Sequence, residues 1–275
     1  MTPNVKHVRL LDTKLSLCNR DQLLGEIERA TAADHKTVVL SANVHAFNLC
    51  CQEDWLRAYY NAADLVRLDG AGVRLGCRIL GHDPPPRMTW ADFAWDLAAY
   101  AEPSGLTLFL LGARPGVAEK AAAQLKTRFP DLRVVGTHHG YFDKIPGCAE
   151  NKAVIEQINA VGPDILIVGF GMPLQERWLM ENWERIDAHV ALTGGAVFDY
   201  ISGELRRAPR WMTDHGLEWL GRLIIEPGRL WRRYLIGNPL FILRVLHQRI
   251  AGARSDHVLE SKRQPSLGSA RDDQP

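Results

Sequence analysis

The sequence predicts a doubly wound α/β domain with a largely parallel, Rossmann-like sheet, followed by a basic helical appendage at the C-terminus. Short apolar runs alternate with amphipathic stretches up to about residue 200. One of these runs, Ile165–Val168, is continuous and apolar, as in strands buried on both faces. The chain then becomes rich in arginine and tryptophan after Gly203. We therefore expect residues 1–203 to form the α/β domain and residues 204–252 the appendage.

Seven apolar runs are expected to form the sheet. They cover residues 5–11, 37–40, 65–68, 106–111, 132–136, 165–168 and 189–193. The run at 106–111 leads into a glycine-rich turn and an alanine-rich helix that stops at Pro130. This strand–turn–helix order is the repeating unit of an α/β domain.

Helices are expected between the strands. They cover residues 19–33, 44–61, 72–80, 88–101, 117–129 and 149–160, with one more beginning at Pro173. In the first of them, Leu23, Leu24 and Ile27 share one face and Asp21 lies in the first turn, which is the pattern of an amphipathic helix. Pro173 is suited to the first position of a helix because its missing N–H has no partner there in any case.

The composition excludes several classes of protein. Charged residues make up 24% of the 275-residue chain and the net charge is +1, so the overall charge does not indicate a protein that attracts nucleic acid over its whole surface. The five cysteines show no C-x-x-C spacing, which argues against a zinc ribbon or disulfide framework and favours a reducing compartment. We expect neither a signal peptide nor a membrane-spanning helix, so any membrane contact is expected to be peripheral.

Asp69 is the candidate catalytic residue. It follows the apolar run Leu65–Leu68 directly, and Gly70 and Gly72 leave space beside its side chain. Ligands of open α/β sheets bind beyond the carboxyl ends of the strands, so an acid in this position is a candidate general base. The alternative is that Asp-Gly is only a turn, in which the carboxylate bonds local backbone groups.

Turns after other strands are candidates for the same site. Ser41 and Asn43 can cap the following helix or hydrogen-bond a ligand, and the two roles can coexist. The turn Gly112–Gly116 precedes a helix whose first amides attract phosphate, although a plain tight turn explains it equally well. The turn is neither a Walker loop nor a dinucleotide fingerprint, and the missing fingerprint argues against a nicotinamide oxidoreductase.

The stretch Arg206–Arg249 carries nine arginines and three acids, a net charge of +6, interleaved with large apolar residues. Pro227 and Pro239 are expected to break it into short helices of about ten residues. Basic amphipathic helices are typical of membrane-surface elements, the interpretation that we favour. Two alternatives stay open: the apolar faces pack on the α/β domain, or the arginines bind nucleic acid. Residues 253–275 are polar and expected to be disordered.

Six motifs occur in a specific order. They are N-x-x-x-F at Asn43–Phe47, D-G-x-G at Asp69–Gly72, L-L-G-A-R-P-G-V-A-E at Leu110–Glu119, G-Y-F at Gly140–Phe142, V-G-x-G-x-P-x-Q-E-x-W at Val168–Trp178 and L-E-W-L-x-R-L-x-x-E-P-x-R-L-x-R-R-Y at Leu217–Tyr234. Together they make the chain resemble the WecG/TagA/CpsF glycosyltransferase family over roughly residues 37–245. One departure is Trp90, where many members have glycine, and we expect it to reshape the donor or acceptor pocket.

The resemblance implies a bacterial inverting transferase that moves a sugar from a UDP-sugar to a saccharide on undecaprenyl diphosphate, in the synthesis of a surface polysaccharide or wall polymer. It makes Asp69 the catalytic base. The substrate-binding residues expected beside it are Ser41, Asn43, Arg87, Gly112, Arg114, Tyr141, Gly171, Gln175, Asp199, Arg222, Arg229 and Arg232. By the resemblance, Tyr141, Gln175 and Asp199 lie near the nucleotide. The last three arginines match positions thought to meet the diphosphate.

The residues themselves favour transfer without a metal or other cofactor. No two aspartates are spaced i, i+2, so the D-x-D metal motif is absent, whereas arginine forks suit phosphate. The expected partners are the UDP-sugar, the lipid-linked acceptor and the inner face of the cytoplasmic membrane, with no nucleic acid and a possible homo-oligomer. The alternative is a non-catalytic, membrane-attached nucleotide-binding protein. The sequence leaves the donor sugar open.

Overall fold

The computed structural model describes residues 5–33 and 35–261, with the side chains of 253–261 left undescribed. The strands are β1 (Lys6–Leu10), β2 (Thr13–Leu17), β3 (Thr37–Ala42), β4 (Leu65–Leu68), β5 (Thr107–Gly112), β6 (Arg133–His138), β7 (Ile165–Gly169) and β8 (Val190–Thr193). The helices up to β8 are α1 (Arg20–Ala32), α2 (Val44–Cys50), α3 (Asp54–Ala62), α4 (Ala71–Ile79), α5 (Trp90–Ser104), α6 (Val117–Arg128), α7 (Ala149–Asn159), α8 (Leu174–Asn182) and the 3₁₀ turn η1 (Trp183–Arg185). After β8 come α9 (Val197–Ile201), α10 (Arg210–Asp214), α11 (Glu218–Ile225), α12 (Pro227–Trp231), the π-helical turn η2 (Arg232–Ile236) and α13 (Gly237–Ser261).

The eight strands form one sheet in the order β1-β2-β4-β3-β8-β7-β5-β6, and only the β1–β2 pair is antiparallel. The predicted doubly wound, largely parallel α/β fold is thus confirmed. The register aligns the carboxyl ends of neighbouring strands, since Ala42 pairs with Leu68 and Val168 with Thr193. Residues just beyond these ends therefore meet at one edge of the sheet.

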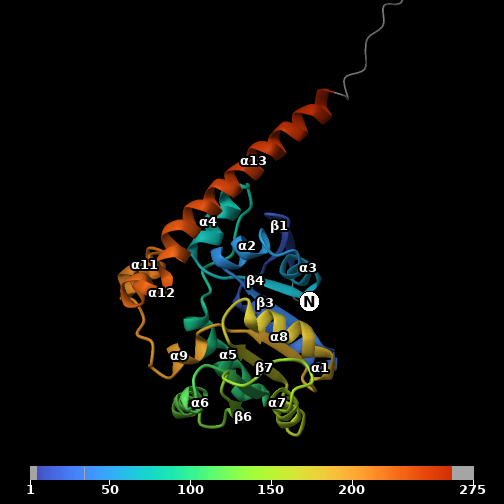
Figure 1. The fold of residues 1–275 in the computed structure, drawn as a ribbon, viewed down its shortest axis with the longest axis vertical. Helices are drawn as coiled ribbons and strands as arrows, with labels where there is room; N and C mark the ends of the chain where they lie inside the picture. The colour runs from blue at the N-terminus through green and yellow to red at the C-terminus, as the bar shows by residue number, and fades with distance from the viewer. Residues whose placement is uncertain (1–4, 34, 262–275) are drawn as a thin grey trace, which may run out of the picture.

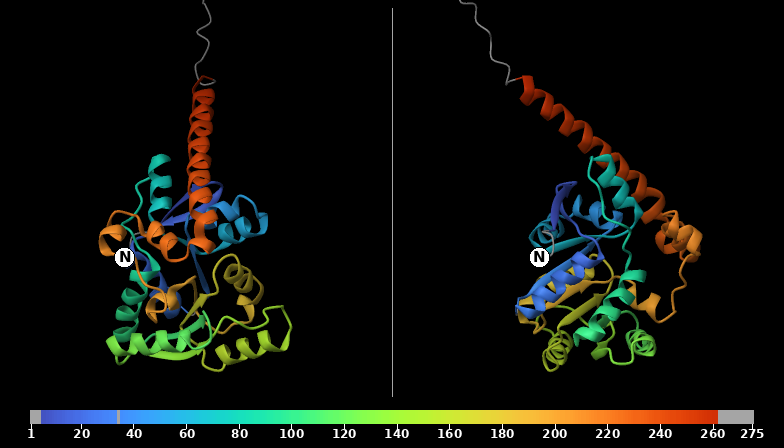
Figure 2. Two further views of the ribbon diagram at one scale, coloured as in Figure 1. Left: turned by 60° about the vertical axis from the view of Figure 1, so that its left-hand side comes forward. Right: turned by 180° about the vertical axis from the view of Figure 1, so that it is seen from behind.

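Helices cover both faces of the sheet (Figures 1 and 2). An apolar core lies between each layer of helices and the strands. On one face, α2, α3, α7 and α8 pack on the strands, and on the other face α1, α5, α6 and α9 do so. Alternation along the strands assigns side chains to the two faces: Leu40 and Val66 join the first core, Val39 and Leu65 the second. This covering of both faces explains why the central strands read as continuous apolar runs.

The N-terminal strand is a hairpin, which the sequence analysis did not anticipate. Leu11 and Asp12 have positive φ angles of 50° and 56° and turn β1 back onto β2. Neither residue is the glycine or asparagine that usually marks such a turn, so the sequence carried no turn signal.

The helix expected over 44–61 is two helices, α2 and α3. The chain leaves the helical path at Gln52 and Glu53, whose amides both bond to the Leu49 carbonyl. These two residues are exposed, whereas Leu56 and Tyr60 of α3 are fully buried, so the break lets α3 bring its own apolar face to the core.

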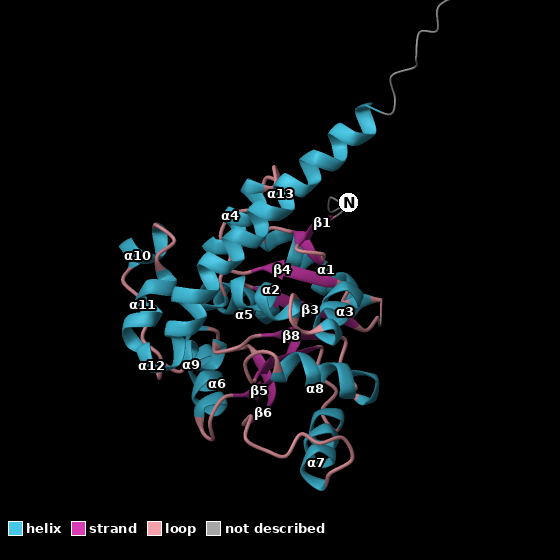
Figure 3. Cartoon of the chain, turned by 45° about the horizontal axis from the view of Figure 1, so that its top comes forward, coloured by secondary structure: helices cyan, strands magenta, loops and turns pink. Residues whose placement is uncertain are grey.

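The C-terminal segment, residues 204–261, differs from the expected chain of short helices. It begins with short helices, but α13 is 25 residues long and projects from the body of the molecule (Figure 3). Pro239 does not break the helical path: α12, η2 and α13 follow one another without a gap, and Pro239 lies just after the π-helical turn η2. The helix continues past residue 252 to Ser261, and the rest of the tail expected to be disordered lies outside the described residues.

The start of α13 belongs to the core of the α/β domain. Phe241 and Val245 are fully buried, and the Phe241 ring lies 5.9 Å from that of Phe47 in α2. Asn48 donates a hydrogen bond to the Gly237 carbonyl at 2.7 Å. The alternative in which apolar faces of the appendage pack on the α/β domain therefore holds for this part of the segment.

Candidate active site

A cavity of about 440 Å³ opens at the carboxyl edge of β3, β4 and β8, and the C-terminal segment forms its opposite wall. Many of the predicted site residues line it: Ser41, Asn43, Asp69, Arg87, Gly171, Gln175, Arg222 and Arg229. The structure thus brings together residues that are as much as 188 positions apart in the chain (Ser41 and Arg229). The candidate base and the turn beginning at Gly171 share one cavity.

Asp69 stands at the end of β4 with its backbone amide bonded to the Ala42 carbonyl at 2.9 Å. Gly70, at φ 88°, turns the chain into α4. Within the described residues, the Asp69 carboxylate has no hydrogen bond or ion pair. Burial raises its pKa above the ordinary value, and Arg67 is the strongest of the charges that oppose this rise. Three further arginines act in the same direction: Arg233, Arg222 and Arg87.

Arg67 is a buried charge that the sequence analysis did not assign to the site. It occupies the middle of β4, fully buried, and donates to Ser41 Oγ at 3.2 Å and to the Met88 carbonyl at 2.5 Å. Its guanidinium lies 5.1 Å from the Trp90 ring and 5.2 Å from the Phe93 ring. The signal in the sequence was the single arginine inside the apolar run before Asp69.

Ser41 and Trp90 form part of the cavity floor. The Ser41 hydroxyl donates to the Thr193 carbonyl at 2.8 Å and accepts from the indole N–H of Trp90 at 2.9 Å. That indole N–H also lies 2.8 Å from the Thr193 carbonyl. The hydroxyl is therefore already satisfied by the protein, and the departure from glycine at position 90 fills space at the ends of β3 and β8.

Asn43 caps α2, accepting from the amides of His45 at 3.0 Å and Ala46 at 3.2 Å. It also lines the cavity, so capping and a place at the site coexist as anticipated. The neighbouring His45 lies in the same wall, where burial and the positive charge of Arg233 lower its pKa to about 4. His45 is therefore neutral at pH 7.

Gln175 joins two glycine turns at the cavity. Its Oε1 accepts from the amides of Gly171 at 3.2 Å and Gly195 at 3.1 Å, and its Nε2 donates to Glu176 at 2.8 Å. Glu176 is fully buried, and burial raises its pKa to about 7. Tyr60 reaches the same Glu176 oxygen at 3.4 Å and the Ser41 carbonyl at 3.0 Å. Gln175 thus positions backbone that lines the cavity.

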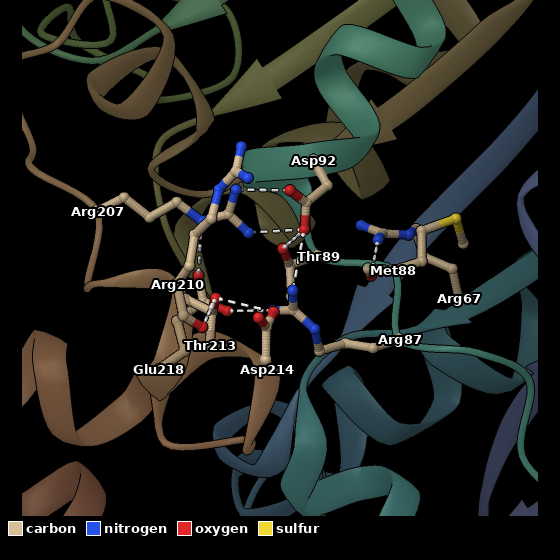
Figure 4. A network of polar contacts seen from close by, with 10 residues as sticks. All are labelled: Arg67, Arg87, Met88, Thr89, Asp92, Arg207, Arg210, Thr213, Asp214 and Glu218. Carbon is tan, nitrogen blue, oxygen red and sulfur yellow. Dashed lines mark hydrogen bonds and ion pairs between the residues drawn. The ribbon is translucent and has the colours of Figure 1, made fainter.

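Arg87 belongs to a charged network that fastens the C-terminal segment to the α/β domain (Figure 4). It donates to Glu218 at 2.9 Å and to Asp92 at 3.3 Å. Arg207 pairs with both oxygens of Asp92 at 2.5 and 2.6 Å, which lowers the pKa of that carboxyl against the effect of burial. The network therefore closes the cavity on the side of α5 and α11.

Two of the three expected appendage arginines line the cavity. Arg222 and Arg229 both pair with Glu226, at 2.9 and 2.8 Å. Arg232 does not line it: the residue is exposed and its guanidinium lies 5.1 Å from the Trp231 ring. The next residue, Arg233, does line the cavity and was not named from the sequence.

The remaining predicted residues lie outside the cavity lining: Gly112, Arg114, Tyr141 and Asp199. Gly112 packs so closely on Gly169 that a Cβ would come within 2.4 Å of its carbonyl oxygen. Arg114 pairs with Glu204 at 3.7 Å, and Tyr141 is 69% exposed. Burial raises the pKa of Asp199, while the charges of Arg114 and Arg222 oppose the rise, so positive charges from both the 112–116 turn and the C-terminal segment act on Asp199.

A doubly wound sheet whose carboxyl edge carries an unpaired acid and several arginines is suited to a transferase that handles a phosphate-bearing substrate. The chain matches the glycosyl transferase WecG/TagA/CpsF family over residues 8–255 and belongs to that family. The resemblance drawn from the six motifs is thereby confirmed.

Three relatives carry the same name, N-acetylglucosaminyldiphosphoundecaprenol N-acetyl-beta-D-mannosaminyltransferase. The one from Bacillus subtilis (strain 168) is 28% identical over 188 residues, which are 68% of this chain and 70% of the relative. The one from Bacillus spizizenii is 27% identical over 226 residues, 82% of this chain and 85% of the relative. The one from Staphylococcus aureus (strain MRSA252) is 26% identical over 216 residues, 78% and 82% of the two chains.

The described residues contain neither a membrane-spanning helix nor a cluster of metal ligands. None of the described helices is both long and apolar enough to cross a membrane. The same residues contain no group of three or more His, Cys, Asp or Glu placed to hold a metal ion.

Proposed function

We propose that this protein transfers a sugar, with inversion and without a metal ion, from a UDP-sugar to a saccharide carried on polyprenyl diphosphate. Family membership supports the reaction class, and the relatives' names support an undecaprenyl-diphosphate acceptor bearing N-acetylglucosamine. The observation that carries the mechanism is the lone carboxylate of Asp69 in a cavity walled by arginines.

In this proposal Asp69 takes the proton from the attacking hydroxyl of the acceptor sugar. The new C–O bond forms as the bond between the anomeric carbon and the UDP oxygen breaks, so one displacement inverts the configuration. General-base catalysis of this kind contributes roughly 10²–10⁴-fold in rate. Because burial raises the pKa of Asp69, the reaction is expected to slow as the pH falls and the carboxylate takes up a proton.

The departing UDP gains negative charge, which arginines can stabilise without a metal. Arg222 and Arg229 are proposed for this role because they line the cavity and can release Glu226 to a diphosphate. For Arg232, the third arginine implied by the resemblance, a role in binding the diphosphate stays a prediction. Its exposed position beside Trp231 gives it no present contact with the cavity.

Asp69→Asn tests the base directly. The amide keeps the shape of the side chain but cannot accept the proton, so turnover is expected to fall by roughly 100-fold or more while UDP affinity stays within about twofold. Asp83→Asn is the matched control, because Asp83 is an exposed acid in the loop after α4. The assay is sugar transfer to a short-chain lipid-diphosphate acceptor, with UDP binding measured by calorimetry.

Two outcomes of this assay would contradict the proposal. Near-normal turnover by Asp69→Asn would show that Asp69 is not the catalytic base. A strict requirement for Mn²⁺ after EDTA treatment would show that arginines alone do not stabilise the departing UDP. The same assay with a panel of UDP-sugars identifies the donor, and UDP-N-acetylmannosamine is the first to try because of the relatives' names. UDP binding without turnover of any donor would favour the non-catalytic nucleotide-binding alternative.

We also propose that the C-terminal segment docks the protein on the inner face of the cytoplasmic membrane. Large apolar side chains there are exposed, among them Ile224 at 69%, Leu235 at 56% and Ile236 at 54%. Arg210, an exposed arginine of the same segment, accompanies them, as in helices that bind anionic lipid surfaces. A polyprenyl-linked acceptor would be presented at such a surface.

A further inference from the structure

The arginines of the cavity wall are not equivalent. Those that line it are Arg87, Arg222, Arg229 and Arg233. The first three each hold a carboxylate: Arg87 holds Glu218 at 2.9 Å, and Arg222 and Arg229 hold Glu226 at 2.9 and 2.8 Å. Among residues 5–33 and 35–252, no carboxylate lies at ion-pair distance from Arg233, and its Nε is buried without a hydrogen-bond partner.

The same cavity holds an opposite charge that is also unpaired. The Asp69 carboxylate has no hydrogen bond or ion pair in the part of the chain that the structure describes. Arg233 is near enough to lower the pKa of both Asp69 and His45. The Arg233 guanidinium lies 5.6 Å from the Tyr234 ring, but its buried Nε has no hydrogen-bond partner. Leaving a buried polar nitrogen unpaired is costly, so a cavity that combines it with a free acid is suited to an anionic ligand.

Arg233 lies in the π-helical turn η2 and lines the cavity. The Gly237 amide bonds to the Arg232 carbonyl, five residues back, which is the signature of a π turn. Arg232 is directed to the surface beside Trp231, whereas Arg233 lines the cavity with Tyr234, whose ring lies 5.9 Å from that of Trp219. Such turns often occur at functional sites because they redirect side chains.

We infer that Arg233, which was not among the arginines implied by the resemblance, binds a phosphate group of the substrate beside Asp69. The inference rests on the proposed function, which supplies diphosphates from two sources, the UDP of the donor and the lipid diphosphate of the acceptor. In either case a phosphate oxygen accepts a hydrogen bond from the Arg233 guanidinium, and Asp69 remains free to take the proton of the acceptor hydroxyl. No bond is made or broken by Arg233 itself.

The test compares Arg233→Met with Arg206→Met in the full-length chain, because Arg206 is an exposed arginine of the same segment outside the cavity lining. UDP and inorganic pyrophosphate are titrated at low salt, and the Michaelis constants for donor and acceptor are measured. Loss of a buried charged hydrogen bond is expected to weaken diphosphate binding roughly 10- to 100-fold in Arg233→Met, whereas Arg206→Met changes it by about twofold or less. Arg233→Lys keeps the charge and is expected to recover part of the affinity, which separates lost binding from lost folding.

The outcomes assign the source or reject the inference. Weaker UDP and pyrophosphate binding assigns Arg233 to the donor, and a raised Michaelis constant for the acceptor alone assigns it to the lipid diphosphate. A second readout is the pH profile, whose acid limb is expected to move to higher pH in Arg233→Met alone, because Asp69 loses a neighbouring positive charge. Unchanged binding and kinetics in Arg233→Met, or equal losses in both variants, would overturn the inference. Failure of the wild-type chain to bind UDP or turn over would instead refute the proposed function.

Discussion

Phe241→Ala is expected to destabilise the whole α/β domain although Phe241 lies in the C-terminal helix. Its ring is fully buried against Phe47, and it lies so close to Gly76 of α4 that a Cβ there would come within 2.8 Å of its Cζ. Truncating a buried phenylalanine leaves a cavity and typically costs about 3–5 kcal/mol. For a chain of this size, each kcal/mol lowers the melting temperature by roughly 2–4 °C.

The measurement is equilibrium unfolding in urea, followed by circular dichroism, on the full-length chain. Leu243→Ala is the matched control, because Leu243 lies on the same helix but is 64% exposed, and it should stay within about 0.5 kcal/mol of the wild type. If Phe241→Ala unfolds at the same urea concentration as the wild type, α13 does not contribute to the core. A division at residue 203 into separately folding parts would then be correct.

Two further predictions follow from burial and exposure. Between pH 4.5 and about 7 the folded state retains a proton on Glu176 that the unfolded state releases, so the free energy of unfolding is expected to fall as pH rises, by at most about 1.4 kcal/mol per pH unit. Urea unfolding at several pH values should show a weaker dependence on pH for Glu176→Gln than for the wild type. An equal dependence of the unfolding free energy on pH in the two proteins would refute this. Replacing Leu235 and Ile236 together by serine is expected to weaken sedimentation with anionic phosphatidylglycerol vesicles about tenfold or more without changing UDP affinity. Ile145→Ser, at a residue 66% exposed outside the C-terminal segment, is the control, and equal effects of the two changes would argue against a specific docking surface.

The sequence predicted the sheet well because its strands are buried on both faces. The runs around Val66, Leu110 and Ile167 are apolar for that reason, and each ends where glycine or a polar residue begins the site. It also predicted Asp69, Asn43 and Gln175 at the cavity, since residues that follow parallel strands necessarily meet at one edge.

The parts that escaped prediction depend on contacts between distant segments. Nothing local in Phe241 distinguishes a side chain that enters the core from one that faces solvent. Arg233 lines the cavity and Arg232 does not, and both lie in a π-helical turn, which regular helical periodicity does not reveal. The satisfied hydroxyl of Ser41 depends on Trp90, 49 positions away.

The contact between the Phe241 ring and Gly76 couples α13 to α4. The helix α13, which carries Phe241, projects outward, while α4, which contains Gly76, starts two residues after Asp69. Arg249 of α13 also donates a hydrogen bond to the Ile79 carbonyl at the end of α4 at 2.5 Å. A displacement of α13 must therefore move α4 with it or break both the ring contact and this hydrogen bond, so the orientation of α13 is coupled to the position of Asp69.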